Sequence, residues 1–188
     1  MMRVLLLVIA LMVCVSGPAL ANEMAGVPLV DQITQEGGAQ LQLNGAGIRS
    51  KFVIKVYVAM LYLENKSSDA AAVIKDTGSK QLIMHFLYKE VAKEKLVEAW
   101  NEGFNGNGSP DQLNALKSEI ERFNSFFETV KKDDRIILDY IPETGTVVTI
   151  AGQQKGTIPG KDFNDLLFSI WLGKKPVTEK LRDGLLGK

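Results

Sequence analysis

A long β-type run between Leu43 and Glu64 constrains the fold more than any other segment of the sequence. It is rich in β-branched and aromatic residues, which favour a pleated sheet. Side chains of a strand alternate between its two faces. One face therefore carries Phe52, Ile54, Val56, Val58, Met60 and Tyr62, and the other carries Lys51, Val53, Lys55, Tyr57 and Ala59. The pattern predicts one long strand with an apolar face and a more polar face.

Two glycines and an arginine stand at the start of this run. Gly45 and Gly47 permit positive φ angles and the close approach of another backbone. We interpret them as a turn that joins a short strand, residues 40–43, to the long strand. Arg49 then lies at the strand entrance, close to the more polar face. Its guanidinium offers a planar fork of donors that fits a carboxylate or an enolate-like oxygen.

The remaining elements follow from periodicity and from capping residues. Leu96, Trp100 and Phe104 recur at helical spacing and predict the buried stripe of one helix. Ser109 and Pro110 begin a second, longer amphipathic helix. Helices are expected over 70–75, 92–104, 109–130, 162–172 and 178–186, and further strands over 80–88, 135–141, 146–151 and 157–158. This order predicts an α+β fold with a mainly antiparallel sheet.

The first 21 residues have the pattern of a secretory signal peptide. Arg3 precedes an almost wholly apolar stretch, residues 4–15, and Ala19-Leu20-Ala21 is a small-x-small cleavage site. The apolar stretch is too short for a transmembrane helix. We therefore expect a periplasmic or secreted domain, residues 22–188, with no stable membrane span after cleavage. Cys14, the only cysteine, lies inside the leader, which excludes disulfides and thiol chemistry from the mature chain.

Charge and motif content argue against several classes of protein. The chain has 22 basic and 22 acidic residues, so nothing indicates a nucleic-acid partner. No metal site and no cofactor are expected: His85 is the single histidine, and Asp133-Asp134 is interpreted as a pair of loop acids. No third glycine opening a helix follows Gly47, which rejects a dinucleotide-binding fingerprint.

Several segments together resemble the chalcone isomerase-like proteins, and in particular the secreted bacterial branch of that family. The resemblance rests on Gly-x-Gly-x-Arg-x-Lys-Phe with the following Lys-Val-Tyr and Leu-Tyr-Leu-Glu, and on segments 85–91, 94–104 and 169–177. It implies an open-faced β-sandwich, in which a large antiparallel sheet is covered on one side by a layer of helices. The ligand cleft of that family lies between the sheet and the helices.

The resemblance also nominates site residues. Arg49 matches an arginine that contacts the ligand both in the plant isomerases and in their fatty-acid-binding relatives. The family's helix lysine matches Lys95, and a C-terminal helix hydroxyl matches Ser169. The isomerases keep a small threonine where this chain has Tyr57. Their tyrosine and asparagine on the helix correspond to Ala92 and Ala99.

These correspondences favour binding over catalysis. A chalcone cyclisation needs an oriented phenolate and stabilisation of the developing enolate, and the ring of Tyr57 would occupy volume that a flavonoid needs. The leading hypothesis is a non-catalytic binder of an apolar small molecule such as a fatty acid, with Arg49, Tyr57 and Ser169 as ligand contacts. One alternative is an isomerase, an intramolecular lyase acting on an enone or chalcone-like substrate, with Arg49, Tyr57 and Lys95 as candidate catalytic residues. The other is a structural or partner-binding envelope protein whose own side chains fill the cleft.

Overall fold

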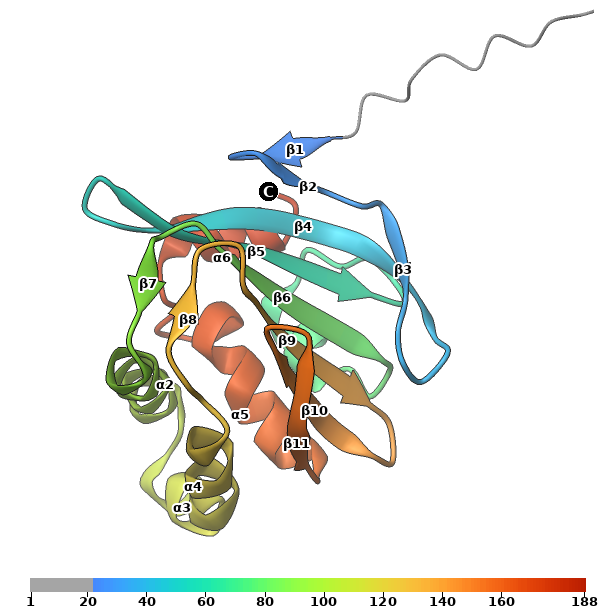
Figure 1. The fold of residues 1–188 in the computed structure, drawn as a ribbon. Coiled ribbons are helices and arrows are strands. Elements are labelled where there is room, and N and C mark those ends of the chain that lie inside the picture. Colours follow the sequence, from blue (N-terminus) through green and yellow to red (C-terminus); the bar gives the residue numbers. More distant parts are fainter. Residues whose placement is uncertain (1–21) are drawn as a thin grey trace, which may run out of the picture.

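The computed structural model describes residues 22–188, and the predicted signal peptide lies outside them. A seven-stranded antiparallel sheet forms the centre of the molecule, in the order β11-β10-β9-β6-β5-β4-β3 (Figure 1). Its strands are β3 (Gln32–Thr34), β4 (Gln40–Lys51), β5 (Ile54–Leu63), β6 (Lys80–Phe86), β9 (Arg135–Ile141), β10 (Gly145–Ile150) and β11 (Gln153–Ile158). Two short strand pairs lie outside it: β1 (Glu23–Met24) with β2 (Val27–Pro28), and β7 (Glu90–Val91) with β8 (Val130–Lys131).

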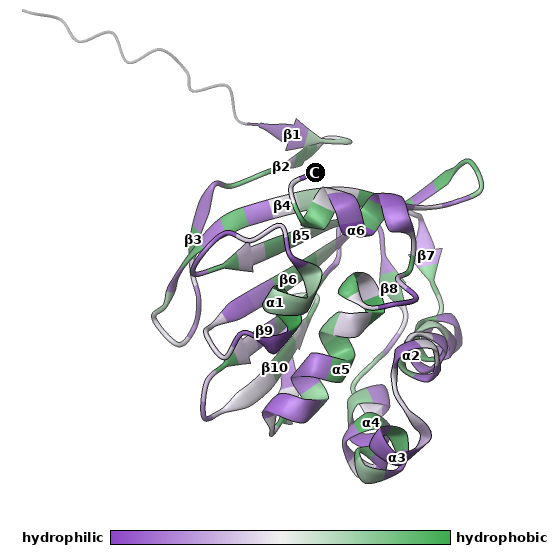
Figure 2. Ribbon diagram, turned by 180° about the vertical axis from the view of Figure 1, so that it is seen from behind, coloured by the Kyte–Doolittle hydropathy of each residue, from purple (hydrophilic) through white to green (hydrophobic). Residues whose placement is uncertain are grey.

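Helices cover one face of this sheet (Figures 1 and 2). They are α1 (Ala70–Lys75), α2 (Lys93–Asn107), α3 (Pro110–Ala115), α4 (Lys117–Ser125), α5 (Lys161–Leu172) and α6 (Glu179–Leu185). Within residues 22–188, none of these helices has the length and apolar character needed to span a bilayer. The predicted α+β class and the open-faced sandwich are confirmed.

The alternation predicted for the long strand divides β5 between two cores. Tyr57, Ala59 and Leu61 face the helices and belong to the main core. Val58 and Met60 face the opposite side and pack in a smaller cluster with residues of the N-terminal segment. The expectation that the Tyr57 face is the more polar one was wrong, because the helical layer covers it.

The glycines that we interpreted as a turn lie instead inside a continuous strand, β4, which runs from Gln40 to Lys51. Neither Gly45 nor Gly47 has a positive φ. Their role is the close approach of helix α6. A Cβ on Gly45 would meet the carbonyl oxygen of Gly184 and lie 2.7 Å from that of Leu185. The actual turn lies five residues after Gly47, at Phe52 and Val53, since Lys51 pairs with Ile54. It divides the predicted long strand into β4 and β5.

The helix predicted over 109–130 is divided in two and ends early. Ser109 is its N-cap as expected, accepting a hydrogen bond from the backbone N–H of Gln112. Leu116 then leaves helical geometry (φ −101°, ψ 16°), and the second piece ends at Ser125. Val130, the last residue of the predicted helix, belongs to β8 and is buried. Apolar spacing alone therefore predicted an apolar face, of which Phe123, Phe127 and Val130 are fully buried, but it missed the two breaks.

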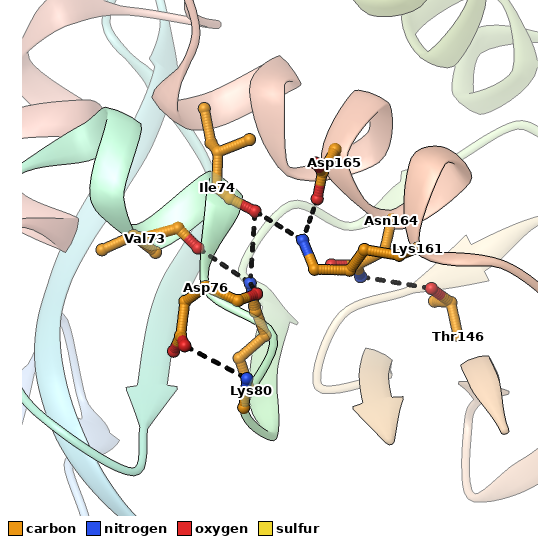
Figure 3. Close-up of polar contacts among 9 residues, drawn as sticks. Val73, Ile74, Asp76, Lys80, Thr146, Lys161, Asn164 and Asp165 are labelled. Atoms are coloured by element: carbon orange, nitrogen blue, oxygen red, sulfur yellow. Dashed lines mark hydrogen bonds and ion pairs between the residues drawn. The ribbon is translucent and has the colours of Figure 1, made fainter. Parts of the chain in front are cut away.

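A buried lysine joins the sheet to the helical layer (Figure 3). Lys80 of β6 is fully buried, and its Nζ donates to the carbonyl oxygens of Val73 (2.8 Å) and Asp76 (2.7 Å) at the end of α1. Lys161 of α5 donates to the Ile74 carbonyl at 2.8 Å. Unpaired carbonyls at a helix C-terminus favour such cations. Burial, with the ammonium of Lys161 nearby, lowers the pKa of Lys80 to about 8.

Candidate functional site

A cleft of about 450 Å³ opens between the sheet and helices α2 and α5. Volumes of 300–1,000 Å³ are typical of sites for small organic ligands. Its walls come from β4, β5, β6, β7, α2, α5 and the link between α5 and α6. The apolar lining residues are Val56, Met84, Phe86, Val91, Leu96, Ala99, Trp100, Ile170, Trp171, Pro176 and Val177. A ligand in this cleft would therefore contact mainly hydrocarbon and aromatic surface.

Arg49 and Tyr57 lie side by side in the wall of the cleft. They are direct partners in the β4–β5 ladder, which places both side chains on the face toward the helices. Gly45 and Gly47 allow α6 to approach β4 just before Arg49, so Arg49 is the first large side chain beyond that contact on the face toward the helices. Its Nη1 donates to the carbonyl of Ser50. Among residues 22–188 no carboxylate forms an ion pair with it.

The hydroxyl of Tyr57 is held by a tryptophan of α5. Trp171 Nε1 donates to Tyr57 Oη at 3.2 Å, and the Tyr57 ring packs on Phe86 with centroids 5.7 Å apart. Tyr57 is 7% exposed. Burial raises the pKa of Tyr57 to about 12, against the smaller opposing effects of Trp171 and Arg49. The phenol is therefore neutral at physiological pH, and its own proton is available to an acceptor in the cleft.

Trp100 of α2 contributes a second indole to the wall. It lies edge-on to Trp171, with ring centroids 5.7 Å apart. Its Nε1 is buried and has no hydrogen-bond partner in the described part of the chain. A buried donor without an acceptor is costly. Arg49, Tyr57 and Trp100 thus give the cleft wall three donors, a set suited to the oxygens of a carboxylate or a carbonyl.

The rim of the cleft carries more cations than anions. Lys51, Lys95 and Lys175 line it together with Glu98 and Glu102. Lys95 and Glu98 are one turn apart on α2 and form an exposed ion pair at 2.5 Å. This hydrogen bond raises the pKa of Lys95 and lowers the pKa of Glu98. Arg49 adds a further positive charge, so the rim favours an anionic head group.

One residue that supports the cleft could not be recognised from the sequence. Asn107 lies beyond the helix predicted over 92–104, but α2 extends to it. Its amide donates to the carbonyl of Lys175 and accepts from the Lys175 N–H, both at 3.0 Å. It therefore anchors the link that supplies Lys175, Pro176 and Val177 to the wall. Asparagine between glycines resembles any loop, so nothing local indicated this role.

Of the other residues that the family resemblance singled out, only some line the cleft. Ala99 lines the cleft, whereas Ala92 is the N-cap of α2 and does not. Ser169 also lies outside the lining, and its hydroxyl donates to the carbonyl of Leu166 at 2.5 Å within α5. The α5 residues that reach the cleft are Ile170 and Trp171. In the described residues, no group of three or more His, Cys, Asp or Glu side chains is placed to hold a metal ion.

Comparisons with known proteins agree with this architecture. The family model described as chalcone isomerase-like matches residues 21–187. Among solved structures, a fatty-acid binding protein of Arabidopsis thaliana matches with a TM-score of 0.57 at 15% identity, covering 83% of this chain and 96% of the plant chain. At that identity the likeness establishes the fold. The search of curated proteins found no match. The match over almost the whole described chain shows that this protein belongs to the chalcone isomerase-like family.

Proposed function

We propose that this protein binds an apolar small molecule with a carboxylate or carbonyl head, the simplest being a fatty acid, and does not transform it. The observation that carries the proposal is the position of Arg49. It lies in the wall of an apolar cleft, beside the hydroxyl of Tyr57, without a carboxylate partner in the described residues. A guanidinium that only stabilises a strand end would be expected to have such a partner.

The mode of binding follows from the lining. The apolar part of the ligand would lie among Trp100, Trp171 and the aliphatic side chains, where burial contributes about 25 cal/mol per Å². The head would accept hydrogen bonds from Arg49 and Tyr57. Excess positive charge at the rim would attract an anionic head. The similar plant structure is described as a fatty-acid binding protein, which supports this class of ligand. We further propose that binding occurs after export, since residues 1–21 have a signal-peptide pattern.

Substitution of Arg49 tests the proposal directly. Charge-assisted hydrogen bonds contribute about 1.5–3 kcal/mol, so Arg49→Ala should weaken binding roughly 10- to 100-fold. Arg49→Lys should retain part of the affinity, because it keeps the charge and loses the bidentate geometry. Ser169→Ala is the matched control, since Ser169 lies outside the cleft lining. Native mass spectrometry of the purified protein, with added palmitate where no lipid co-purifies, measures occupancy.

The outcomes are distinct. Loss of occupancy in Arg49→Ala, with an unchanged circular dichroism spectrum and full occupancy in Ser169→Ala, supports the proposal. Equal occupancy in all variants would overturn the role of Arg49. Turnover of chalcones or other enones above the buffer rate would instead support the isomerase alternative. That reaction needs a proton donor near Arg49, and a phenol with a pKa of about 12 is poorly matched to proton transfer at neutral pH.

A further inference from the structure

The turn between β4 and β5 exposes its largest apolar side chains to solvent. Phe52 is 92% exposed and Val53 is 96% exposed, and Ile54 is also exposed. The turn projects beyond the sheet in Figure 1, and Figure 2 colours its end as hydrophobic. Lys51 and Lys55 flank these three residues. We refer to residues 51–55 as the hairpin tip.

The amino acids at the hairpin tip are not the ones that would stabilise this turn best. Lys51 pairs with Ile54, so the loop has only two residues, Phe52 and Val53. Two-residue hairpin loops favour Asn-Gly or similar pairs, because these residues accept positive φ. Phe52 has φ +55°, an uncommon conformation for a bulky residue. The chain therefore keeps an exposed phenylalanine at a position where asparagine or glycine would fold more easily.

Positive charge surrounds the apolar tip, although the whole chain has a formal net charge of zero. No acidic residue occurs from Gln40 to Leu63. On one side of the tip, Lys51 belongs to the rim of the ligand cleft, which has an excess of cations. On the other side lies a groove between β4 and α6, where Lys55, Lys180 and Lys188 accompany a single acid, Asp183.

We infer that the hairpin tip docks on the surface of an anionic lipid bilayer, with Phe52, Val53 and Ile54 inserted among the head groups and the lysines on the lipid phosphates. Interfacial binding strengthens with buried apolar area and with attraction between cations and anionic lipids, and the hairpin tip supplies both. A stable protein partner would need about 800 Å² on this chain, and a two-residue turn offers little of that area. Because Lys51 belongs to both the tip and the cleft rim, docking would bring the cleft entrance to the bilayer. This inference rests on the proposed function only in naming the bilayer as the source of the ligand.

Vesicle flotation tests the inference with the full mature chain. The probes are vesicles of phosphatidylethanolamine with phosphatidylglycerol, and vesicles of phosphatidylcholine alone. Phe52→Asn with Val53→Ser removes the apolar surface and relieves the positive-φ position, since asparagine accepts it. We expect this variant to fold at least as stably and to bind anionic vesicles more than tenfold more weakly. Lys55→Glu should weaken binding to anionic vesicles several-fold, roughly fivefold for each lost cation, and salt should weaken it further.

Val30→Ser is the matched control, since Val30 is 54% exposed and contacts Tyr62, at the far end of β5 from the tip. Normal binding by this variant, with loss in the tip variant, supports the inference. Equal flotation of wild type and tip variant would show that the contact lies elsewhere. A wild type that floats with neither vesicle would overturn bilayer docking and leave the tip as a site for a protein. Palmitate occupancy of the tip variant, measured separately, should be unchanged, so failure here is distinguishable from failure of the Arg49 proposal.

Discussion

Replacing Tyr57 by phenylalanine removes one hydroxyl from the cleft wall and leaves the ring packed on Phe86. Trp171 is 1% exposed, and its N–H donates to that hydroxyl. In the variant this buried N–H has no acceptor. Leaving a buried donor unsatisfied costs about 1–3 kcal/mol. We therefore expect the free energy of unfolding at neutral pH to fall by that amount.

The same variant should also change how the free energy of unfolding depends on pH in the alkaline range. Tyr57 keeps its proton up to about pH 12 in the folded protein, whereas its ordinary pKa is 10.0. In this window the folded state binds more protons than the unfolded chain, so stability falls as pH rises. The difference of about two pKa units corresponds to roughly 2.7 kcal/mol. Tyr57→Phe lacks this loss, and the two stability curves should converge toward pH 12.

Urea unfolding followed by far-ultraviolet circular dichroism measures both effects. The other tyrosines are common to both proteins, so their titration cancels in the difference. Tyr88→Phe is the control, because Tyr88 is 42% exposed and should change stability little at any pH. A constant gap between wild type and Tyr57→Phe from neutral to alkaline pH would refute the assigned pKa. No gap at neutral pH would refute the Trp171 hydrogen bond.

Three further predictions concern the elements around the site. Gly45→Ala should lower the free energy of unfolding by about 1–3 kcal/mol, as overpacking does, because its Cβ would collide with backbone atoms of α6. The control is Gly106→Ala, whose Cβ would have only ordinary contacts at 3.7 Å and which should be neutral or stabilising. The midpoints of urea unfolding compare the two variants. Lys80→Met should lower stability at neutral pH by about 1–3 kcal/mol, since carbonyls at the end of α1 lose their donor. It should also abolish a rise in stability between about pH 8 and 10.5, where the unfolded chain retains the proton that folded Lys80 releases; an unchanged pH profile would contradict the pKa. Asn107→Ala should reduce the hydrogen-exchange protection of the Lys175 amide and lower palmitate occupancy, and unaltered protection would show that the link is held by other contacts.

The sequence predicted the elements whose signals are local. Strand alternation assigned residues 57–60 of β5 to the correct faces, and the stripe of Leu96, Trp100 and Phe104 is buried. Val56 was predicted on the Val58 face but packs with the main core and lines the cleft. Gly45 and Gly47 were misread because a glycine needed for close packing and a glycine needed for a turn look alike along the chain. The partner that requires them, α6, lies near the opposite end of the sequence.

The candidate site was predictable only in part, for a similar reason. Resemblance to the family nominated Arg49 and Tyr57, which are cross-strand partners in the cleft. It also nominated Ser169, which lies on the expected helix but outside the lining, since a helix boundary alone does not specify which face meets the sheet. The hydrogen bonds of Trp171 and Asn107 span 114 and 68 residues. No local pattern encodes contacts of that range.

The two tryptophans of this chain are its only ones, and both lie in the wall of the cleft. All of the protein's tryptophan fluorescence therefore originates at the candidate site. One indole is hydrogen-bonded and the other has an unpartnered N–H, so a ligand oxygen that reaches Trp100 would alter the emission of that ring. Its edge-on neighbour, Trp171, would sense the change through energy transfer. The unmodified protein thus carries a built-in optical reporter, and ligands could be screened by emission without labelling.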